Sequence, residues 1–114
     1  MLIRMFVKSS NLDESKKVCD DILNGLEKYI CEKRYLSNKL YWKMDSVFTV
    51  EINLKLKEKI SVGELEKFLS LISDKWKTYW NPINEVLISN TMHECNMKRS
   101  EIVMLNMFFE NSEV

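Results

Sequence analysis

Hydrophobic and polar residues alternate with a period of two between residues 47 and 57. The apolar members are Phe48, Val50, Ile52, Leu54 and Leu56, and polar residues occupy the positions from Thr49 to Lys57 between them. This alternation is typical of a β-strand with one buried face, because successive side chains of a strand point to opposite sides of the sheet. The pattern predicts a sheet with helices packed across its apolar face.

Three other stretches are predicted to be strands with fewer polar positions. Residues 2–8 carry apolar side chains on both faces, which is typical of a strand inside a sheet. Residues 85–92 and 101–109 predict two more strands, separated by a polar loop. The last of them is also apolar on both faces, so we expect it to be covered on both sides or to meet another protein. The tail, residues 111–114, is predicted to be frayed.

The strand before residue 47 is predicted over residues 35–44, and its register depends on the loop that follows. A two-residue loop would place Trp42 against the polar Thr49. A three-residue loop at residues 45–47 pairs Trp42 with Val50 and Leu40 with Ile52. A shift of one residue moves every side chain to the other face, so burial favours the three-residue loop.

A first amphipathic helix is predicted over residues 12–33 from apolar positions at three- and four-residue steps. Asn11 followed by Glu14 has the spacing of a capping box at its start. Gly25 within it costs about 1 kcal/mol of helix propensity relative to Ala. We therefore expect Gly25 to mark a close approach of this helix to the sheet.

A second helix is predicted from Ser61, where Ser61 and Glu64 form a capping box. Its apolar stripe consists of Leu65, Phe68, Leu69, Ile72, Trp76 and Tyr79. Pro82 disfavours helical structure at the residue before it, so the helix is expected to end near Trp80.

These elements follow one another as β-α-β-β-α-β-β in a single domain over residues 1–110. Two helices that connect strands of one sheet, with a hairpin between them, resemble the ferredoxin-like split β-α-β plan with one added strand. Right-handed crossovers would place both helices on the same face. The predicted fold is α+β, with a mainly antiparallel sheet and two helices packed on one side.

Composition and charge argue against several classes of function. The 114 residues include 17 Lys and Arg and 17 Asp and Glu, so the formal net charge is zero. Nucleic-acid binding relies on excess positive charge, so no nucleic-acid partner is expected. No run approaches the roughly 18 apolar residues of a membrane span, and the first residues lack a signal-peptide pattern. We expect no membrane association and a cytoplasmic protein whose three cysteines are reduced.

Reactive side chains crowd together at His93, Glu94 and Cys95. A thiolate nucleophile needs a base and a group that orients the base, and adjacency in sequence does not provide that geometry. We therefore favour a polar loop without catalytic residues. Cys19 and Cys31 are twelve residues apart on the predicted helix, about 18 Å along its axis. No metal site and no cofactor are expected.

The surface points instead to a protein partner. Asp20, Asp21 and Glu27 are predicted on the outer side of the first helix as candidates for an acidic contact surface, although charges in this pattern more often form a plain solvated face. Trp80, Met104 and Met107 are predicted as apolar contacts in the second half of the chain, because Trp and Met are enriched at interfaces.

A compact, motif-free domain that is rich in Lys and Asn and carries an exposed charged face is similar to the immunity proteins of bacterial toxin systems. The resemblance implies a non-catalytic inhibitor of the antitoxin type that occludes the active site of a cognate toxin. Two alternatives remain open. One is a homodimeric ferredoxin-like module that binds a small ligand, and the other is a small enzyme that uses His93 and Cys95.

Overall fold

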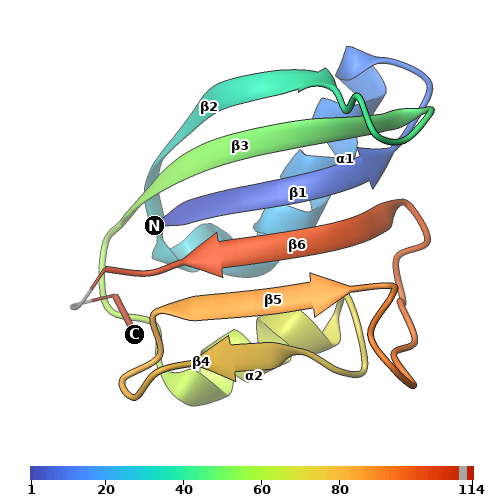
Figure 1. The fold of residues 1–114 in the computed structure, drawn as a ribbon. Helices are drawn as coiled ribbons and strands as arrows, with labels where there is room; N and C mark the ends of the chain where they lie inside the picture. Colours follow the sequence, from blue (N-terminus) through green and yellow to red (C-terminus); the bar gives the residue numbers. More distant parts are fainter. Residues whose placement is uncertain (111–112) are drawn as a thin grey trace.

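The computed structural model describes residues 1–110 and 113–114 and confirms an α+β fold. Over these residues the chain forms a six-stranded antiparallel sheet and two α-helices. The elements in chain order are β1 (Leu2–Lys8), α1 (Leu12–Leu23), the 3₁₀ helix η1 (Asn24–Tyr29), β2 (Ile30–Leu40), β3 (Val47–Leu56), α2 (Val62–Ser70), β4 (Lys77–Tyr79), β5 (Glu85–Ser89) and β6 (Ile102–Phe108). Figure 1 shows both helices behind the sheet, so the sheet has one covered face and one open face.

The strand order across the sheet is β2-β3-β1-β6-β5-β4. The prediction that residues 2–8 form an inner strand is confirmed, because β1 lies between β3 and β6. The last strand is also an inner one, paired with β1 on one side and β5 on the other. The ferredoxin-like plan with one added strand is not confirmed, because the strand count and the strand order differ from it. The extra strand, β4, comes from a segment predicted as helix.

The core lies between the covered face of the sheet and the two helices. Strand β3 contributes Val50, Ile52 and Leu54, as its alternating pattern predicted, while Asn53 and Lys55 are exposed. The neighbouring strands and both helices supply further buried side chains, among them Ile3, Met5, Val7, Cys19, Ile22, Leu26, Leu65, Phe68, Leu69, Val86, Ile88, Leu105 and Met107. One continuous core therefore holds both helices and most strands.

The first helix starts where predicted but ends earlier. The Asn11 side chain accepts a hydrogen bond from the Glu14 backbone N–H at 2.8 Å, which confirms the N-cap. The α-helix ends at Leu23, and the predicted extension to residue 33 is wrong. In η1, Leu26 and Tyr29 are both buried. A 3₁₀ helix has three residues per turn, so these two side chains share a face and imitate the spacing of an α-helix.

The second helix is also shorter than predicted. The Ser61 hydroxyl accepts a hydrogen bond from the Glu64 N–H at 3.2 Å, as the capping box predicted. Helix α2 ends at Ser70, and residues 77–79 form β4 instead of its last turn. The buried Ser73 hydroxyl accepts from the Lys75 N–H and donates to the Lys75 carbonyl, which competes with helical hydrogen bonding.

A long-range contact also ends the second helix. The Asp74 carboxylate accepts hydrogen bonds from the backbone N–H and the side-chain amide of Asn96. The Lys98 N–H donates to the Ile72 carbonyl at 2.8 Å. Residues 72–74 are thus held against the loop before β6, and a continuous helix to Trp80 could not make these contacts.

The predicted register of the β2–β3 hairpin is wrong. Leu40 pairs with Phe48, and Tyr35 pairs with Ile52. The connecting loop covers residues 41–46 and is twice as long as the predicted three residues. Two register shifts in β2, between Ile30 and Glu32 and between Tyr35 and Ser37, each place one extra residue in β2 relative to β3.

Both chain ends pack against the body of the domain. The Met1 ammonium donates to the Leu54 carbonyl at 3.0 Å and forms an ion pair with the Glu113 carboxylate at 2.7 Å. Val114 is buried in the core cluster. Of the tail predicted to be frayed, residues 111–112 lie outside the described residues, whereas residues 113–114 make these contacts.

Candidate protein-binding surface

The loop that joins β2 and β3 is held firmly at its base. The Tyr41 N–H donates to the Val47 carbonyl at 2.7 Å, and the Ser9 N–H donates to the Ser46 carbonyl at 2.9 Å. The Tyr41 ring packs edge-on against the Phe6 ring, with centroids 5.0 Å apart. The loop therefore projects from the sheet in a defined position, next to the turn between β1 and α1 (Figure 1).

Three large apolar side chains at this loop are exposed. The exposed fraction is 83% for Trp42, 61% for Leu40 and 43% for Met44. We call these three residues the tip cluster. A single exposed Leu is ordinary, but a Trp that exposes most of its surface beside two other apolar side chains is unusual for a free protein surface.

The apolar surface continues from the tip cluster onto two neighbouring elements. Leu12, at the start of α1, is half exposed, and its carbonyl accepts a hydrogen bond from the Asn38 side chain of β2 at 3.0 Å. Asn38 also accepts a hydrogen bond from the Ser15 hydroxyl at 3.1 Å. Leu36, at the second irregularity of β2, is half exposed as well. The start of α1 and the edge strand thus extend the surface.

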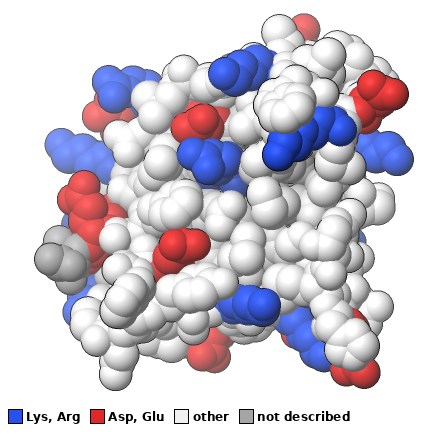
Figure 2. All heavy atoms as spheres, viewed as in Figure 1, with Lys and Arg blue, Asp and Glu red and all other residues white. Residues whose placement is uncertain are grey.

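The open face of the sheet offers a second apolar surface, but a less exposed one. Leu2, Leu87, Met104 and Phe108 are partly buried. Arg4 lies over the Phe108 ring, with its guanidinium carbon 5.9 Å from the ring centroid. In Figure 2 uncharged side chains cover most of this face, and Lys, Arg, Asp and Glu are scattered among them.

The predicted acidic contact residues lie on the opposite side of the sheet, and two of them are engaged within the chain. Asp20 accepts hydrogen bonds from the Lys33 ammonium at 2.6 Å and the Tyr35 hydroxyl at 2.5 Å. Asp21 forms an ion pair with Arg99 at 3.0 Å. Glu27 is exposed in η1.

The Asp20 contacts change the acidity of two groups. Burial alone would raise the pKa of Asp20, but the hydrogen bonds from Lys33 and Tyr35 outweigh burial and lower it. Burial, together with the hydrogen bond to Asp20, raises the pKa of Tyr35. Asp20 therefore joins α1 to β2 as a carboxylate.

The three predicted apolar contact residues are not brought together. Trp80 is 78% exposed, at the turn after β4, and Met104 is partly buried on the open face. Met107 is fully buried on the covered face, where a partner has no access to it. The sequence reasoning missed Trp42, because it placed this residue inside a strand opposite Val50.

The segment from His93 to Cys95 lies in the loop between β5 and β6. The His93 side chain is 94% exposed, and its Nε2 lies 3.6 Å from the Glu94 carboxylate. The Cys95 sulfur lies 3.1 Å from the Ser73 hydroxyl. Among the described residues no hydrogen bond joins the Cys95 sulfur to His93, so the structure shows no thiol–imidazole pair here.

The three cysteines are free. Burial raises the pKa of the Cys19 thiol to about 12, whereas Cys31 is exposed on β2. Within the part of the chain that the structure describes, no group of three or more His, Cys, Asp or Glu is placed to hold a metal ion.

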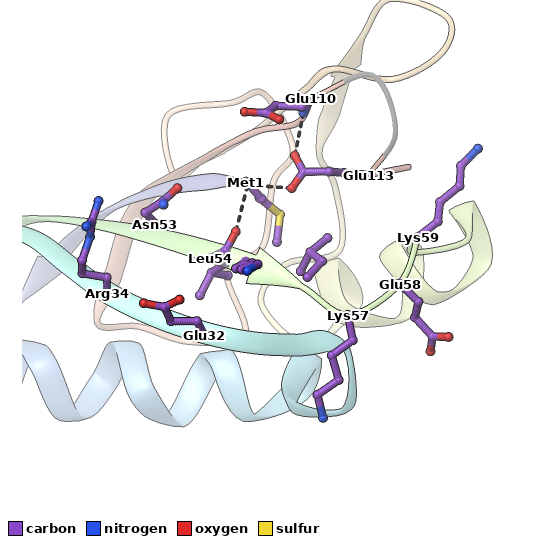
Figure 3. A pocket seen from close by; sticks show the side chains of 12 residues that line it. Met1, Glu32, Arg34, Asn53, Leu54, Lys57, Glu58, Lys59, Glu110 and Glu113 are labelled. Carbon is purple, nitrogen blue, oxygen red and sulfur yellow. Dashed lines mark hydrogen bonds and ion pairs between the residues drawn. The ribbon is translucent and has the colours of Figure 1, made fainter.

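A hollow of about 490 Å³ lies beside the N-terminus at the ends of β2 and β3. Its lining mixes acidic and basic side chains, including Glu32, Arg34 and Lys57. Figure 3 shows the side chains of Lys57, Glu58 and Lys59 pointing in different directions instead of converging on one point. The charged side chains of this hollow therefore do not converge on one point where a charged ligand could bind.

Comparison with protein-family models, with curated protein sequences and with solved structures found no match to this chain. No helix in the described ranges has both the length and the apolar composition needed to cross a bilayer.

Proposed function

We propose that the chain is a non-catalytic protein-binding domain that inhibits its partner by covering a functional surface, in the manner of an immunity protein. The observation that carries the proposal is the exposure of Trp42 on a loop whose base is fixed by hydrogen bonds and ring packing. Trp is the residue type most typical of interface hot spots. A side chain held in place before binding loses less entropy when the complex forms.

In this proposal the tip cluster enters a recess of the partner, and the start of α1 and the edge of β2 cover the surface around it. Leu12 and Leu36 lie on these two elements and are half exposed. Inhibition then results from steric exclusion of the partner's substrate, and no chemical step by this chain is required.

The proposal is tested by capture followed by a functional assay. The tagged chain, its Trp42→Ala variant and its Trp80→Ala variant are each incubated with a lysate of the source organism, and the retained proteins are identified by mass. We expect one stoichiometric partner with the wild type and with Trp80→Ala, and none with Trp42→Ala. Trp80, predicted from the sequence as a contact residue, is the matched control, because its exposure is similar at 78% and it follows β4, at the sheet edge opposite β2, so this proposal places it outside the interface.

The captured partner is then produced alone and together with each variant in a bacterial host. Growth arrest by the partner, relieved by the wild type and not by Trp42→Ala, supports the immunity reading. A partner whose production is harmless, or whose toxicity is relieved equally by Trp42→Ala, contradicts it.

A further inference from the structure

We propose that the tip cluster docks an acidic segment of a partner protein, one that combines carboxylates with aromatic or aliphatic side chains. This inference rests on the proposed function and names the chemistry that the partner presents. It is drawn from the distribution of charge around Leu40, Trp42 and Met44, compared with the rest of the surface.

Three lysines lie at the tip cluster or at the base of its loop. Lys39 and Lys43 flank Leu40 and Trp42 in sequence, and Lys8 pairs with Val47 at the base of the loop. Among the described residues, none of these three lysines takes part in an ion pair. Their charges are therefore free to meet carboxylates of another molecule.

The loop itself carries one carboxylate, Asp45, against the ammonium groups of Lys39, Lys43 and Lys8 at the tip and its base. Asp13 and Glu14 belong to the first turn of α1, where the helix dipole favours negative charge. Within a chain of zero net charge, the loop and its base therefore carry more ammonium groups than carboxylates.

Lysine and aromatic ring are already combined at the tip. The Lys43 ammonium lies 4.9 Å from the centroid of the Trp42 ring, within the range of a cation–π contact. A partner side chain that packs on Trp42 thus lies next to a fixed positive charge. In the partner, an acidic residue close to an apolar one could pair with the Lys43 ammonium while the apolar side chain packs on the Trp42 ring.

Other anionic or apolar partners fit the tip less well. An anionic membrane would have to accept Asp45, which lies beside Met44 and would face lipid headgroups of like charge. Single-stranded nucleic acid stacks on aromatic rings, but two of the three tip side chains are aliphatic. A symmetric contact with a second copy would bring the same lysines of both copies together. A protein segment can place its carboxylates opposite Lys39 and Lys43 and an uncharged residue opposite Asp45, so it avoids each of these conflicts.

The experiment is selection of binders from a random peptide library displayed on phage, with the folded wild-type chain as target. Enriched peptides are synthesised, and their affinities are measured for the wild type, Trp42→Ala, the charge-reversal pair Lys39→Glu with Lys43→Glu, and Trp80→Ala. We expect acidic peptides with aromatic or aliphatic residues. Their dissociation constants should rise about tenfold or more with Trp42→Ala and with charge reversal, and stay unchanged with Trp80→Ala. Circular dichroism checks that every variant is folded.

Several outcomes overturn the inference. Enriched peptides without an acidic bias, peptides that bind Trp42→Ala as well as the wild type, or a library that yields no binder sensitive to Trp42 each contradict it. So does Trp42-dependent binding to vesicles containing phosphatidylserine or to a single-stranded oligonucleotide, or a Trp42-dependent dimer in light scattering. Enrichment of acidic peptides that need Trp42 supports the docking inference even if the captured partner proves not to be a toxin. The growth assay therefore tests the proposed function separately from the peptide selection.

Discussion

Gly25 offers a direct test of how η1 packs against α2, since its replacement by Ala has two effects of opposite sign on stability. Ala would restrict the unfolded chain and stabilise the fold by about 0.4–1 kcal/mol. However, an added Cβ at Gly25 would lie 3.1 Å from Cδ1 of Phe68 and 3.2 Å from Cδ1 of Leu71. The close approach of this glycine is thus to α2 and the residue after it, and not to the sheet as the sequence suggested.

Whether Gly25→Ala stabilises or destabilises the fold depends on how far the side chains of Phe68 and Leu71 can move away from the new methyl group. Leu71 is exposed and can move away, but Phe68 is fully buried and cannot move without disturbing the core. Extra methyl groups in a packed core cost roughly 1–3 kcal/mol. We therefore expect Gly25→Ala to destabilise the fold by about 1 kcal/mol in total.

Gly63 provides the matched control, because it lies in α2 and a Cβ there would meet nothing within 4 Å. Gly63→Ala should stabilise the fold by about 0.5–1 kcal/mol through helix propensity alone. Urea denaturation followed by circular dichroism measures both free energies of unfolding at an unchanged m-value. If Gly25→Ala is as stable as Gly63→Ala, the packing argument for Phe68 is refuted.

Three further changes probe contacts described above. Asp20→Asn should lower the free energy of unfolding by up to about 1 kcal/mol near neutral pH. The pKa of Asp20 in the folded protein lies below its ordinary value of 3.8. The difference in free energy of unfolding between the wild type and Asp20→Asn should therefore persist above pH 3.8 and vanish as the pH falls through the folded pKa. Urea titrations at neutral pH and at a pH below the folded pKa check this. A thiol reagent should modify Cys31 quickly and Cys19 only after unfolding, and rapid modification of Cys19 would contradict its burial. Glu113→Gln should cost about 1–3 kcal/mol by removing the ion pair of the largely buried Met1 ammonium, whereas an unchanged urea midpoint would show that this pair adds nothing.

Local signals in the sequence predicted the parts of the fold that depend on local physics. The alternation at Val50, Ile52 and Leu54 located a buried strand face, and the caps at Asn11 and Ser61 located both helix starts. Each of these features is determined by residues within a few positions of one another, so the printed sequence contains the whole cause.

The errors arose where distant residues compete with local preference. The second helix ends early because Asp74 is bound by Asn96, which lies 22 positions further along the chain. Trp42 was assigned to a strand because it shares a parity with Leu36, Leu40 and Met44, yet the pairing that starts at Ile30 and Leu56 ends at Leu40 and Phe48, before Trp42 is reached. The sequence analysis therefore missed the candidate surface, because the register of β2 against β3 depends on how the whole sheet assembles.

The position of β6 has a consequence for the order in which the protein forms. The sheet consists of two parts, β2-β3-β1 and β6-β5-β4, and among the described strands the pairing of β1 with β6 is the one that joins them. This pairing matches Leu2 with Phe108, residues separated by almost the whole described chain. Pairing over such distances closes slowly, because the entropy of a long loop is lost before the contact forms.

During synthesis β1 is made before β6 and keeps one edge open until residues 102–108 have followed. An open strand with apolar side chains is a template for pairing with other chains. A chain interrupted before Ile102 would expose this edge permanently, so aggregation of such fragments is the cost of placing the last strand beside the first.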